Sequence, residues 1–312
     1  MEHVQVGAKT ISRMSLGTVQ LGMNYGISNT LGQPDEAQSF SMLSTAFENG
    51  VNSLDTARVY GNSEEVLGRF LSQYRGELPY ITTKIPDVNG FDPCDIEKKV
   101  IESVEISLDK LGLKKVDNLM LHSAENLVSY GDRLAPVMES LVKRGYTDQI
   151  GVSVYTGADI DRMLQYDVYT TTQVPMSVFD QRLIHGGYIK KLKDRNFTVF
   201  VRSVFLQGLC FLNPDTLTDS GLIQYAAEPI RSIRLFAEKE NMTVAELAIA
   251  FIRDLDGVTS LVLGADTPAQ VKDNVRYFKT RRISEEIRND IFKTFENVNI
   301  PKIMEVLSRP KN

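Results

Sequence analysis

Four side chains of this sequence could together move a proton onto a carbonyl oxygen: Asp55, Tyr60, Lys84 and His122. A free tyrosine has a pKa of about 10, which is too high for efficient proton exchange near neutral pH. A neighbouring lysine lowers that pKa because a positive charge favours the phenolate. Asp55 would hold Lys84 in place and keep it charged, while His122 would donate a hydrogen bond to the substrate carbonyl. Tyr60 is then the general acid of a reduction and the general base of an oxidation.

We expect the four residues to meet because each ends or follows an apolar segment typical of a buried strand. These segments are Val51–Gly61, Tyr80–Ile85 and Val116–His122. In a parallel α/β barrel the C-terminal ends of the strands converge on one face, where catalysis takes place. Taken alone, each residue has an ordinary structural explanation, but the four types together at strand ends are a more specific signal.

Strand and helix patterns alternate along the whole chain. The strand candidates are Met14–Val19, Val51–Thr56, Tyr80–Ile85, Val116–Leu121, Ile150–Val154, Thr171–Met176, Thr198–Arg202 and Ser260–Leu263. The helical segments are Asp35–Asn49, Ser63–Tyr74, Pro93–Leu111, Arg133–Arg144, Ala158–Tyr166, Gly187–Arg195, Leu222–Lys239, Val244–Asp254 and Thr267–Tyr277. Such alternation without a linker predicts an α/β fold, a closed (β/α)8 TIM barrel that forms one domain over residues 1–312.

Further elements are expected at the two ends of the barrel sequence. Val4–Val6 and Thr10–Arg13 predict an N-terminal hairpin. Ile283–Asn297 predicts an extra C-terminal helix, and Pro301–Lys311 a short tail. Capping-box patterns predict two helix starts, in the segments Asn62–Glu65 and Thr243–Glu246.

Composition favours a soluble cytoplasmic enzyme. The net charge of −5, without a basic run, argues against nucleic-acid binding. The N-terminal residues resemble neither a signal nor a transit peptide, and no apolar run approaches the roughly 20 residues that span a bilayer. Cys94 and Cys210 lack metal-ligand spacing, so we expect no metal site. The oligomeric state stays open.

The chain resembles the aldo-keto reductases over nearly its whole length. The motifs that carry the resemblance are Gly50–Ala57 with Tyr60-Gly61 and Ser63-Glu64, Leu108 with Leu111-Gly112 and Val116-Asp117, Gly151-Val152-Ser153, Gln173 with Pro175 and Asp180-Gln181-Arg182, and Gly264-Ala265 with Gln270 and Asn274. The resemblance implies hydride transfer between a nicotinamide cofactor, NADPH or NADH, and a small carbonyl compound.

It also implies where the cofactor binds, across the C-terminal face and without a Rossmann glycine fingerprint. The implied contacts are Gly17, Thr18 and Asp55 near the nicotinamide ribose, Ser153 and Gln173 at the carboxamide, Ser203, Phe205, Gln207 and Gly208 along the pyrophosphate, and Gly264, Asp266, Gln270 and Asn274 around the adenosine.

Two departures from the family pattern bear on the nicotinamide. Val154 stands where many members have asparagine, so one carboxamide contact is lost. Arg202 stands where many place an aromatic ring on the nicotinamide. A planar guanidinium can stack there, but its charge disfavours the cationic oxidised form. We therefore expect tighter binding of the reduced cofactor.

A third departure bears on coenzyme choice. Asp266 lies in the turn where NADPH-preferring members offer Arg or Lys; it would repel a 2′-phosphate and could accept a hydrogen bond from a free ribose hydroxyl. Alternatively, Asp266 only caps the helix at Thr267, or Lys272 or Arg276 reaches the phosphate. The turn argues against a strict NADPH requirement, and both coenzymes stay open.

The substrate side is less specific. The chain has no tryptophan, and Val19 occupies a position where such a ring often stands. Candidates for the pocket wall are the loop residues Met23, Asn24, Tyr25 and Arg58. Asn24 and Arg58 could hydrogen-bond hydroxyls or a carboxylate, which suits a sugar-like or polar carbonyl compound, although a solvated loop is an equal explanation. Two other functions remain: a non-catalytic, cofactor-sensing regulatory subunit on the same fold, and a barrel isomerase or lyase, against which Ser153 and Gln173 argue.

Overall fold

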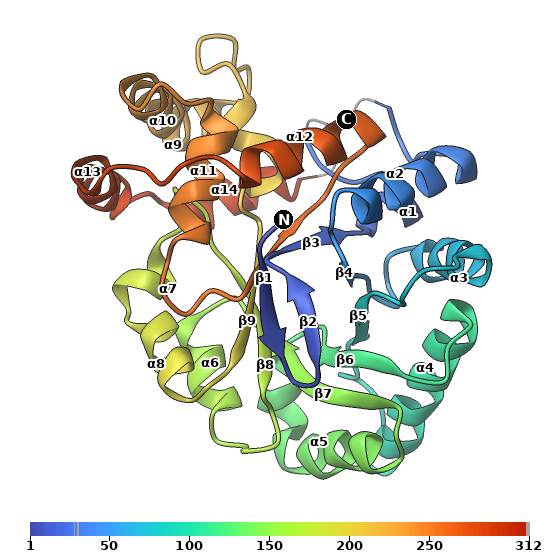
Figure 1. Ribbon diagram of the computed structural model, residues 1–312. Coiled ribbons are helices and arrows are strands. Elements are labelled where there is room, and N and C mark those ends of the chain that lie inside the picture. Colours follow the sequence, from blue (N-terminus) through green and yellow to red (C-terminus); the bar gives the residue numbers. More distant parts are fainter. Residues whose placement is uncertain (28, 30, 310–312) are drawn as a thin grey trace.

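The computed structural model describes residues 1–27, 29 and 31–309, which form a closed barrel of parallel strands (Figure 1). The strands follow one another around the barrel in chain order, and the last pairs with the first. They are β3 (Met14–Gly17), β4 (Ser53–Asp55), β5 (Tyr80–Ile85), β6 (Val116–Leu121), β7 (Thr147–Ser153), β8 (Thr171–Pro175), β9 (Thr198–Arg202) and β10 (Ser260–Leu263). The predicted (β/α)8 barrel is confirmed.

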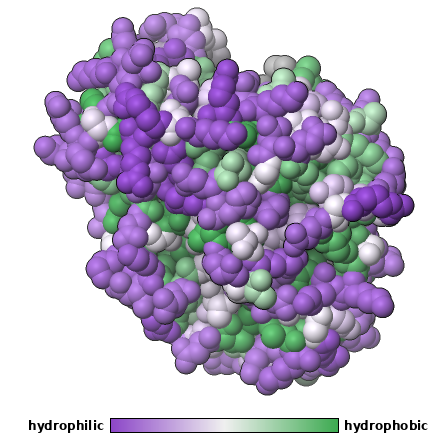
Figure 2. Space-filling view, viewed as in Figure 1, coloured by the Kyte–Doolittle hydropathy of each residue, from purple (hydrophilic) through white to green (hydrophobic). Residues whose placement is uncertain are grey.

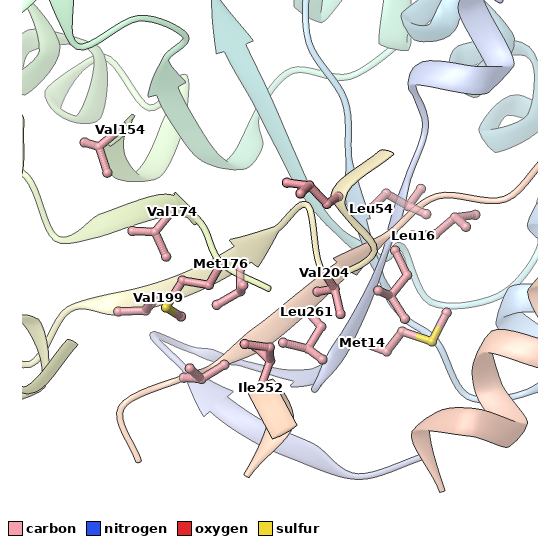
Figure 3. Packing of buried hydrophobic residues seen from close by; sticks show 14 of the residues in the cluster. Met14, Leu16, Leu54, Val154, Val174, Met176, Val199, Val204, Ile252 and Leu261 are labelled. Carbon is pink, nitrogen blue, oxygen red and sulfur yellow. The ribbon is translucent and has the colours of Figure 1, made fainter. Parts of the chain in front are cut away.

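The strands are buried on both faces, as expected for a barrel wrapped in helices. On β3 and β4, Leu16 and Leu54 belong to the large apolar core that the helices share, and both are fully buried (Figure 3). The alternate residues Ser15 and Ser53 are joined by a hydrogen bond of 2.7 Å. Ser15 also lies 2.9 Å from the hydroxyl of Ser260 on β10. Alternation along each strand therefore gives one face to the helices and the other to the barrel interior.

The predicted N-terminal hairpin is confirmed as β1 (His3–Val6) and β2 (Lys9–Ser12), an antiparallel pair. It lies across the middle of the ring of strands in Figure 1, and hydrophilic residues cover most of the outer rim in the same view (Figure 2). Val6 and Ile11 pack against an apolar cluster from the barrel strands, formed by Tyr80, Met120 and Phe200. The hairpin therefore closes this end of the barrel and leaves the other end for a site.

Helices surround the strands (Figure 1). They are α1 (Val19–Gly22), α2 (Glu36–Glu48), α3 (Ser63–Gln73), α4 (Ile96–Leu111), α5 (Glu125–Lys143), α6 (Gly157–Met163), α7 (Arg182–His185), α8 (Tyr188–Asp194), the 3-10 helix η1 (Leu206–Phe211), α9 (Ser220–Tyr225), α10 (Ala227–Lys239), α11 (Val244–Arg253), α12 (Pro268–Phe278), α13 (Glu285–Phe295) and α14 (Ile300–Leu307). None of those in the described ranges is long and apolar enough to span a membrane.

Several element boundaries differ from the sequence prediction. The helix predicted over Arg133–Arg144 begins at Glu125, with a non-helical residue at Tyr130. The predicted tail is mostly the helix α14, since Pro301 is tolerated in a first turn and Ile300 and Ile303 are buried. The tail's residues 310 and 311 lie outside the described part of the chain.

One predicted capping box is confirmed and the other is wrong. The Thr243 hydroxyl accepts from the backbone N–H of Glu246, whose carboxylate accepts in return from the Thr243 backbone. Asn62 is the N-cap of α3 but makes no side-chain cap. The side-chain oxygen of Asn62 accepts instead from the Gln33 side-chain amide at 2.8 Å, so a tertiary contact replaces the local one.

Candidate active site

A cavity of about 610 Å³ lies at the end of the barrel opposite the hairpin, among the C-terminal ends of the strands. Gly17, Asp55 and Arg202 each end a strand and line it, and His122 directly follows β6. Because the strands are parallel and in chain order, residues far apart in sequence meet here, as the sequence predicted.

The cavity floor is built on a buried ion pair between Lys84 and Asp55. The Lys84 Nζ donates to both Asp55 carboxylate oxygens, at 2.8 and 2.7 Å, and to the Thr56 carbonyl at 3.0 Å. Strand register explains the contact: Asp55 pairs with Thr82, and Lys84 follows two residues later on the same face of β5. The Gln173 amide also donates to Asp55, at 2.7 Å. Asp55 is thereby fixed from two sides.

Lys84 remains charged in this setting. Burial favours the neutral amine, but the Asp55 carboxylate and the Tyr60 phenol outweigh that effect, by charge and by hydrogen bonding, and raise the pKa of Lys84 above its usual value. The lysine side chain is 0% exposed and that of Asp55 is 6% exposed. Each charge therefore depends on the other, because an isolated ion at this depth would be strongly unfavourable.

Tyr60 lies between this pair and the cavity. Its hydroxyl is 3.4 Å from the Lys84 Nζ, and the ammonium is 5.0 Å from the ring centroid. Burial raises the pKa of Tyr60 by more than Lys84 lowers it, and Asp55 adds to the increase. Lys84 thus lowers the pKa of Tyr60, as the sequence predicted, but burial outweighs this effect in the free protein. Tyr60 is therefore a neutral phenol at pH 7, the form required of an acid.

Two glycines position Tyr60. A Cβ on Gly22 of α1 would lie 1.8 Å from the Tyr60 carbonyl oxygen, and one on Gly61 would lie 2.0 Å from the Gly22 carbonyl oxygen. Gly61 also has a φ of +55°, which favours glycine. The end of α1 and the Tyr60 turn thus approach more closely than side chains would permit, which explains the Tyr60-Gly61 pair of the sequence.

His122 lies beside Tyr60, with ring centroids 5.6 Å apart and planes at 83°. Burial, together with the charges of Lys84 and Arg202, lowers the pKa of His122 to about 4. The imidazole is therefore neutral at pH 7 and carries one N–H donor. Within the described ranges neither ring nitrogen has a hydrogen-bond partner, so that donor is available to a ligand.

Most residues predicted to hold a cofactor line the same cavity. They are Gly17, Thr18, Gln173, Arg202, Ser203, Phe205, Gln207, Gly208, Gly264, Asp266, Gln270 and Asn274, and the predicted substrate residues Val19 and Tyr25 join them. Ser153 is buried at the end of β7 and does not reach the cavity surface, and neither does Arg58 in the loop after β4. Lys84 lies behind Tyr60.

Two features of the lining fit an extended dinucleotide. Ser203, Gln207 and Gly208 on the lining, and the buried Leu206 next to them, all have positive φ, and such strain costs about 1–3 kcal/mol for each non-glycine residue and gathers at ligand sites. Turns of this kind can present backbone N–H groups to anions such as a pyrophosphate. Here the N–H groups of Leu206 and Gly208 donate to the carbonyls of Ser203 and Phe205 within the turn. Near Gly264, the buried Gln20 Oε1 has no hydrogen-bond partner in the described structure, which leaves an acceptor for a ligand.

The end of the cavity beside α12 is acidic. Asp266 and Asp273 both line it, and the Arg276 guanidinium is held by Asp273 at 2.8 Å. The helix cap is Thr267, whose hydroxyl accepts from the Gln270 N–H, so Asp266 is not the cap. Its carboxylate accepts instead from the Asn29 amide at 3.1 Å, and burial raises the pKa of Asp266. Lys272 does not reach the lining.

Several residues of the lining were not predicted from the sequence: Gln20, Tyr155, Phe211, Ala245, Asp273 and Tyr277. Gln20 and Tyr155 follow β3 and β7 closely, so their place after a strand end was an available signal. Phe211 and Ala245 come from the long connection between β9 and β10, whose path no local pattern reveals.

A parallel barrel with a lysine–aspartate pair, a tyrosine and a neutral histidine at the C-terminal ends of its strands defines a class of barrel oxidoreductases. A family model described as the aldo/keto reductase family matches residues 13–293. This protein belongs to the aldo/keto reductase family and is an oxidoreductase.

Individual relatives are distant but similar along most of their length. The NADH-specific methylglyoxal reductase of Escherichia coli (strain K12) is 26% identical, over 88% of this chain and 93% of the relative. The uncharacterized oxidoreductase YqkF of Bacillus subtilis (strain 168) is 24% identical, over 88% and 90%. The holo form of the aldo-keto reductase AKR11C1 from Bacillus halodurans has a TM-score of 0.76 at 22% identity, over 94% and 96% of the two chains, which shows a shared fold.

Proposed function

We propose that this protein reduces an aldehyde or ketone to an alcohol, with a proton from Tyr60 and a hydride from a reduced nicotinamide cofactor. The observation that carries the proposal is the assembly of Asp55, Lys84, Tyr60 and His122 around one cavity. The cofactor, when bound, supplies the hydride that the carbonyl carbon receives. The residues around it supply the proton and the orientation.

Each side chain has a distinct task in this proposal. His122, neutral at pH 7, donates a hydrogen bond to the carbonyl oxygen and orients the substrate. Tyr60 gives its proton to the oxygen as the alkoxide forms. The Lys84 ammonium, 3.4 Å away, then stabilises the phenolate that remains. Asp55 holds that ammonium in place through both carboxylate oxygens.

The test compares Tyr60→Phe with Tyr74→Phe, a tyrosine at the end of α3 that packs against Phe47 and Phe70 away from the cavity. Loss of a general acid lowers turnover by about 10²–10⁴-fold. We expect that loss in Tyr60→Phe, with cofactor affinity nearly unchanged, and wild-type turnover in Tyr74→Phe. Turnover of methylglyoxal with NADH, followed by absorbance, is the first assay. Comparable turnover in Tyr60→Phe would refute Tyr60 as the acid.

We further propose that the preferred coenzyme is NADH. Asp266 and Asp273 line the adenosine end, and no lysine or arginine of the described chain joins them on the lining there. A 2′-phosphate needs cationic partners, whereas an acidic residue suits a free ribose hydroxyl. The NADH-specific relative in Escherichia coli is consistent with this choice.

Coenzyme choice is tested by titrating the protein with NADH and NADPH, measured by quenching of tyrosine fluorescence. We expect NADH to bind at least about 10-fold more tightly, and Asp266→Asn to reduce the difference. The control variant is Asp256→Asn, an exposed carboxylate that pairs with Lys193 away from the cavity. Equal affinities in the wild type would reject the preference. Tight binding without turnover of any carbonyl would favour the regulatory-subunit alternative.

A further inference from the structure

We propose that Arg202, with Tyr25 and Tyr155, forms an anion subsite beside the catalytic residues, so that the carbonyl substrate carries a carboxylate or a phosphate. This inference rests on the proposed function and narrows its substrate class. Three observations support it: the placement of the Arg202 guanidinium, its lack of a carboxylate partner, and the phenol groups gathered around it.

Arg202 ends β9 and is held by weak contacts only. Its guanidinium carbon lies 4.3 Å from the centroid of the Tyr155 ring. One terminal nitrogen donates to the Val154 carbonyl at 3.3 Å, and the other to the Ser203 hydroxyl at 3.4 Å. Both distances are longer than is usual for N–H···O hydrogen bonds. The stacked ring fixes the plane of the guanidinium while most of its donor capacity stays unused.

The charge of Arg202 has no counterion within the described ranges. No carboxylate of the described residues lies within ion-pair distance of it. Two of the carboxylates on the lining have cationic partners of their own, Asp55 in Lys84 and Asp273 in Arg276, and the third, Asp266, accepts from the Asn29 amide. Among the residues that the structure describes, Arg202 is also the one lysine or arginine on the cavity lining. A half-buried guanidinium without a counterion gives this part of the cavity a positive potential, which attracts and holds anions.

This charge lies beside the reacting groups. Arg202, Tyr60, His122, Tyr25 and Tyr155 all line the same cavity. The Arg202 charge lowers the pKa of both Tyr60 and His122, although burial has the larger effect on each. Burial raises the pKa of Tyr25, and the Arg202 charge lowers it by a smaller amount, as expected for a phenol on the same cavity wall. An acid group at Arg202 would therefore belong to the same small molecule as a carbonyl at Tyr60.

Guanidinium and phenol groups suit carboxylates and phosphates alike. A guanidinium offers parallel N–H donors that match two oxygens of either group. The Tyr25 and Tyr155 hydroxyls each offer one more donor. The shared chemistry is an anionic oxygen group on an aldehyde or ketone, which reaction converts to a hydroxy acid or a hydroxyalkyl phosphate. The hydride goes to the carbonyl carbon, the Tyr60 proton to its oxygen, and the nicotinamide is oxidised.

The test uses matched substrates that differ in charge. Succinic semialdehyde is compared with its methyl ester, and glyceraldehyde 3-phosphate with glyceraldehyde, each at saturating NADH. We expect the wild type to favour at least one anionic member by 10-fold or more in kcat/KM. In Arg202→Met that ratio should fall at least 10-fold, chiefly through KM, and Arg202→Lys should restore part of it. The first pair reports on a carboxylate and the second on a phosphate.

A binding measurement separates this inference from the catalytic proposal. The NADH complex is titrated with 4-hydroxybutyrate against 1,4-butanediol, and with glycerol 3-phosphate against glycerol, with NADH fluorescence as the signal. We expect selective binding of an anionic alcohol, lost in Arg202→Met. No preference for anions in either measurement would overturn the subsite. An equal loss of affinity for charged and neutral compounds in Arg202→Met, together with weaker NADH binding, would also overturn it and would assign Arg202 to the cofactor. Selective anion binding without turnover would preserve the subsite and reject the carbonyl reduction.

Discussion

Replacing Lys84 by methionine should destabilise the fold strongly and in a pH-dependent way. The ammonium donates to Asp55 at 2.8 and 2.7 Å, and the two side chains are 0% and 6% exposed. Without it, the Asp55 carboxylate keeps the Gln173 amide as its side-chain donor. Breaking a buried ion pair by removing one partner costs about 3–5 kcal/mol. We expect a loss of that size in the free energy of unfolding of Lys84→Met at pH 8.

The loss should shrink in acid. In Lys84→Met the buried Asp55 carboxylate has lost its counterion, and burial of an unpaired charge favours the protonated, neutral form of the acid. The folded variant should therefore bind more protons than the unfolded chain in mild acid, so its stability falls as pH rises out of that range. The wild type behaves differently: the raised pKa of Lys84 contributes stability below about pH 10.4, and this contribution is lost as pH rises through the folded pKa.

Urea unfolding followed by far-UV circular dichroism, at pH 4 to 8, measures both effects. Two controls isolate the cause. The double variant Asp55→Asn/Lys84→Met should be less pH-dependent than Lys84→Met, since the orphaned carboxylate is gone. Lys115→Met breaks an exposed ion pair of 2.8 Å with Asp148 and should cost at most about 1 kcal/mol. A loss below about 1 kcal/mol in Lys84→Met, or one that is the same at pH 4 and pH 8, would contradict this reasoning.

Three further outcomes can be measured. Gly22→Ala should lower both stability and kcat, because its Cβ would meet the Tyr60 carbonyl oxygen at 1.8 Å. In the control Gly264→Ala the new Cβ meets only the far end of the Gln20 side chain, so its free energy of unfolding should stay within about 1 kcal/mol of the wild-type value. Thermal melts and turnover measure both effects. The pH profile of kcat/KM for reduction should stay level through neutrality and fall only as pH approaches the raised pKa of Tyr60, above 10; a descending limb near pH 7 would show that another group controls the reaction. Arg202→Leu should reduce the preference for NADH over NAD+, measured by fluorescence titration of both forms, and an unchanged ratio of affinities would reject a role for the Arg202 charge in that preference.

Local chemistry determined the elements and the residue types of the site. The apolar run of a segment such as Ser260–Leu263 predicts a strand, because a strand buried on both faces is apolar almost throughout. The Thr243 capping box is likewise contained in four consecutive residues. Parallel barrel strands all end on one face, so the meeting of Asp55 and His122 at the cavity followed from the order of elements alone.

Only the tertiary structure decided which of these residues share a surface. Gln173 reaches Asp55 across 118 residues of sequence, and Arg202 stacks on Tyr155, a residue the sequence analysis did not select. The family resemblance implied that Ser153 contacts the cofactor, yet this last residue of β7 is buried below the cavity surface. The net effect on the Tyr60 pKa also required three dimensions, because burial and charge act in opposite directions and only their distances decide the balance. Sequence patterns describe neighbours along the chain, whereas stacking, burial and charge balance depend on strand register and on the paths of long connections.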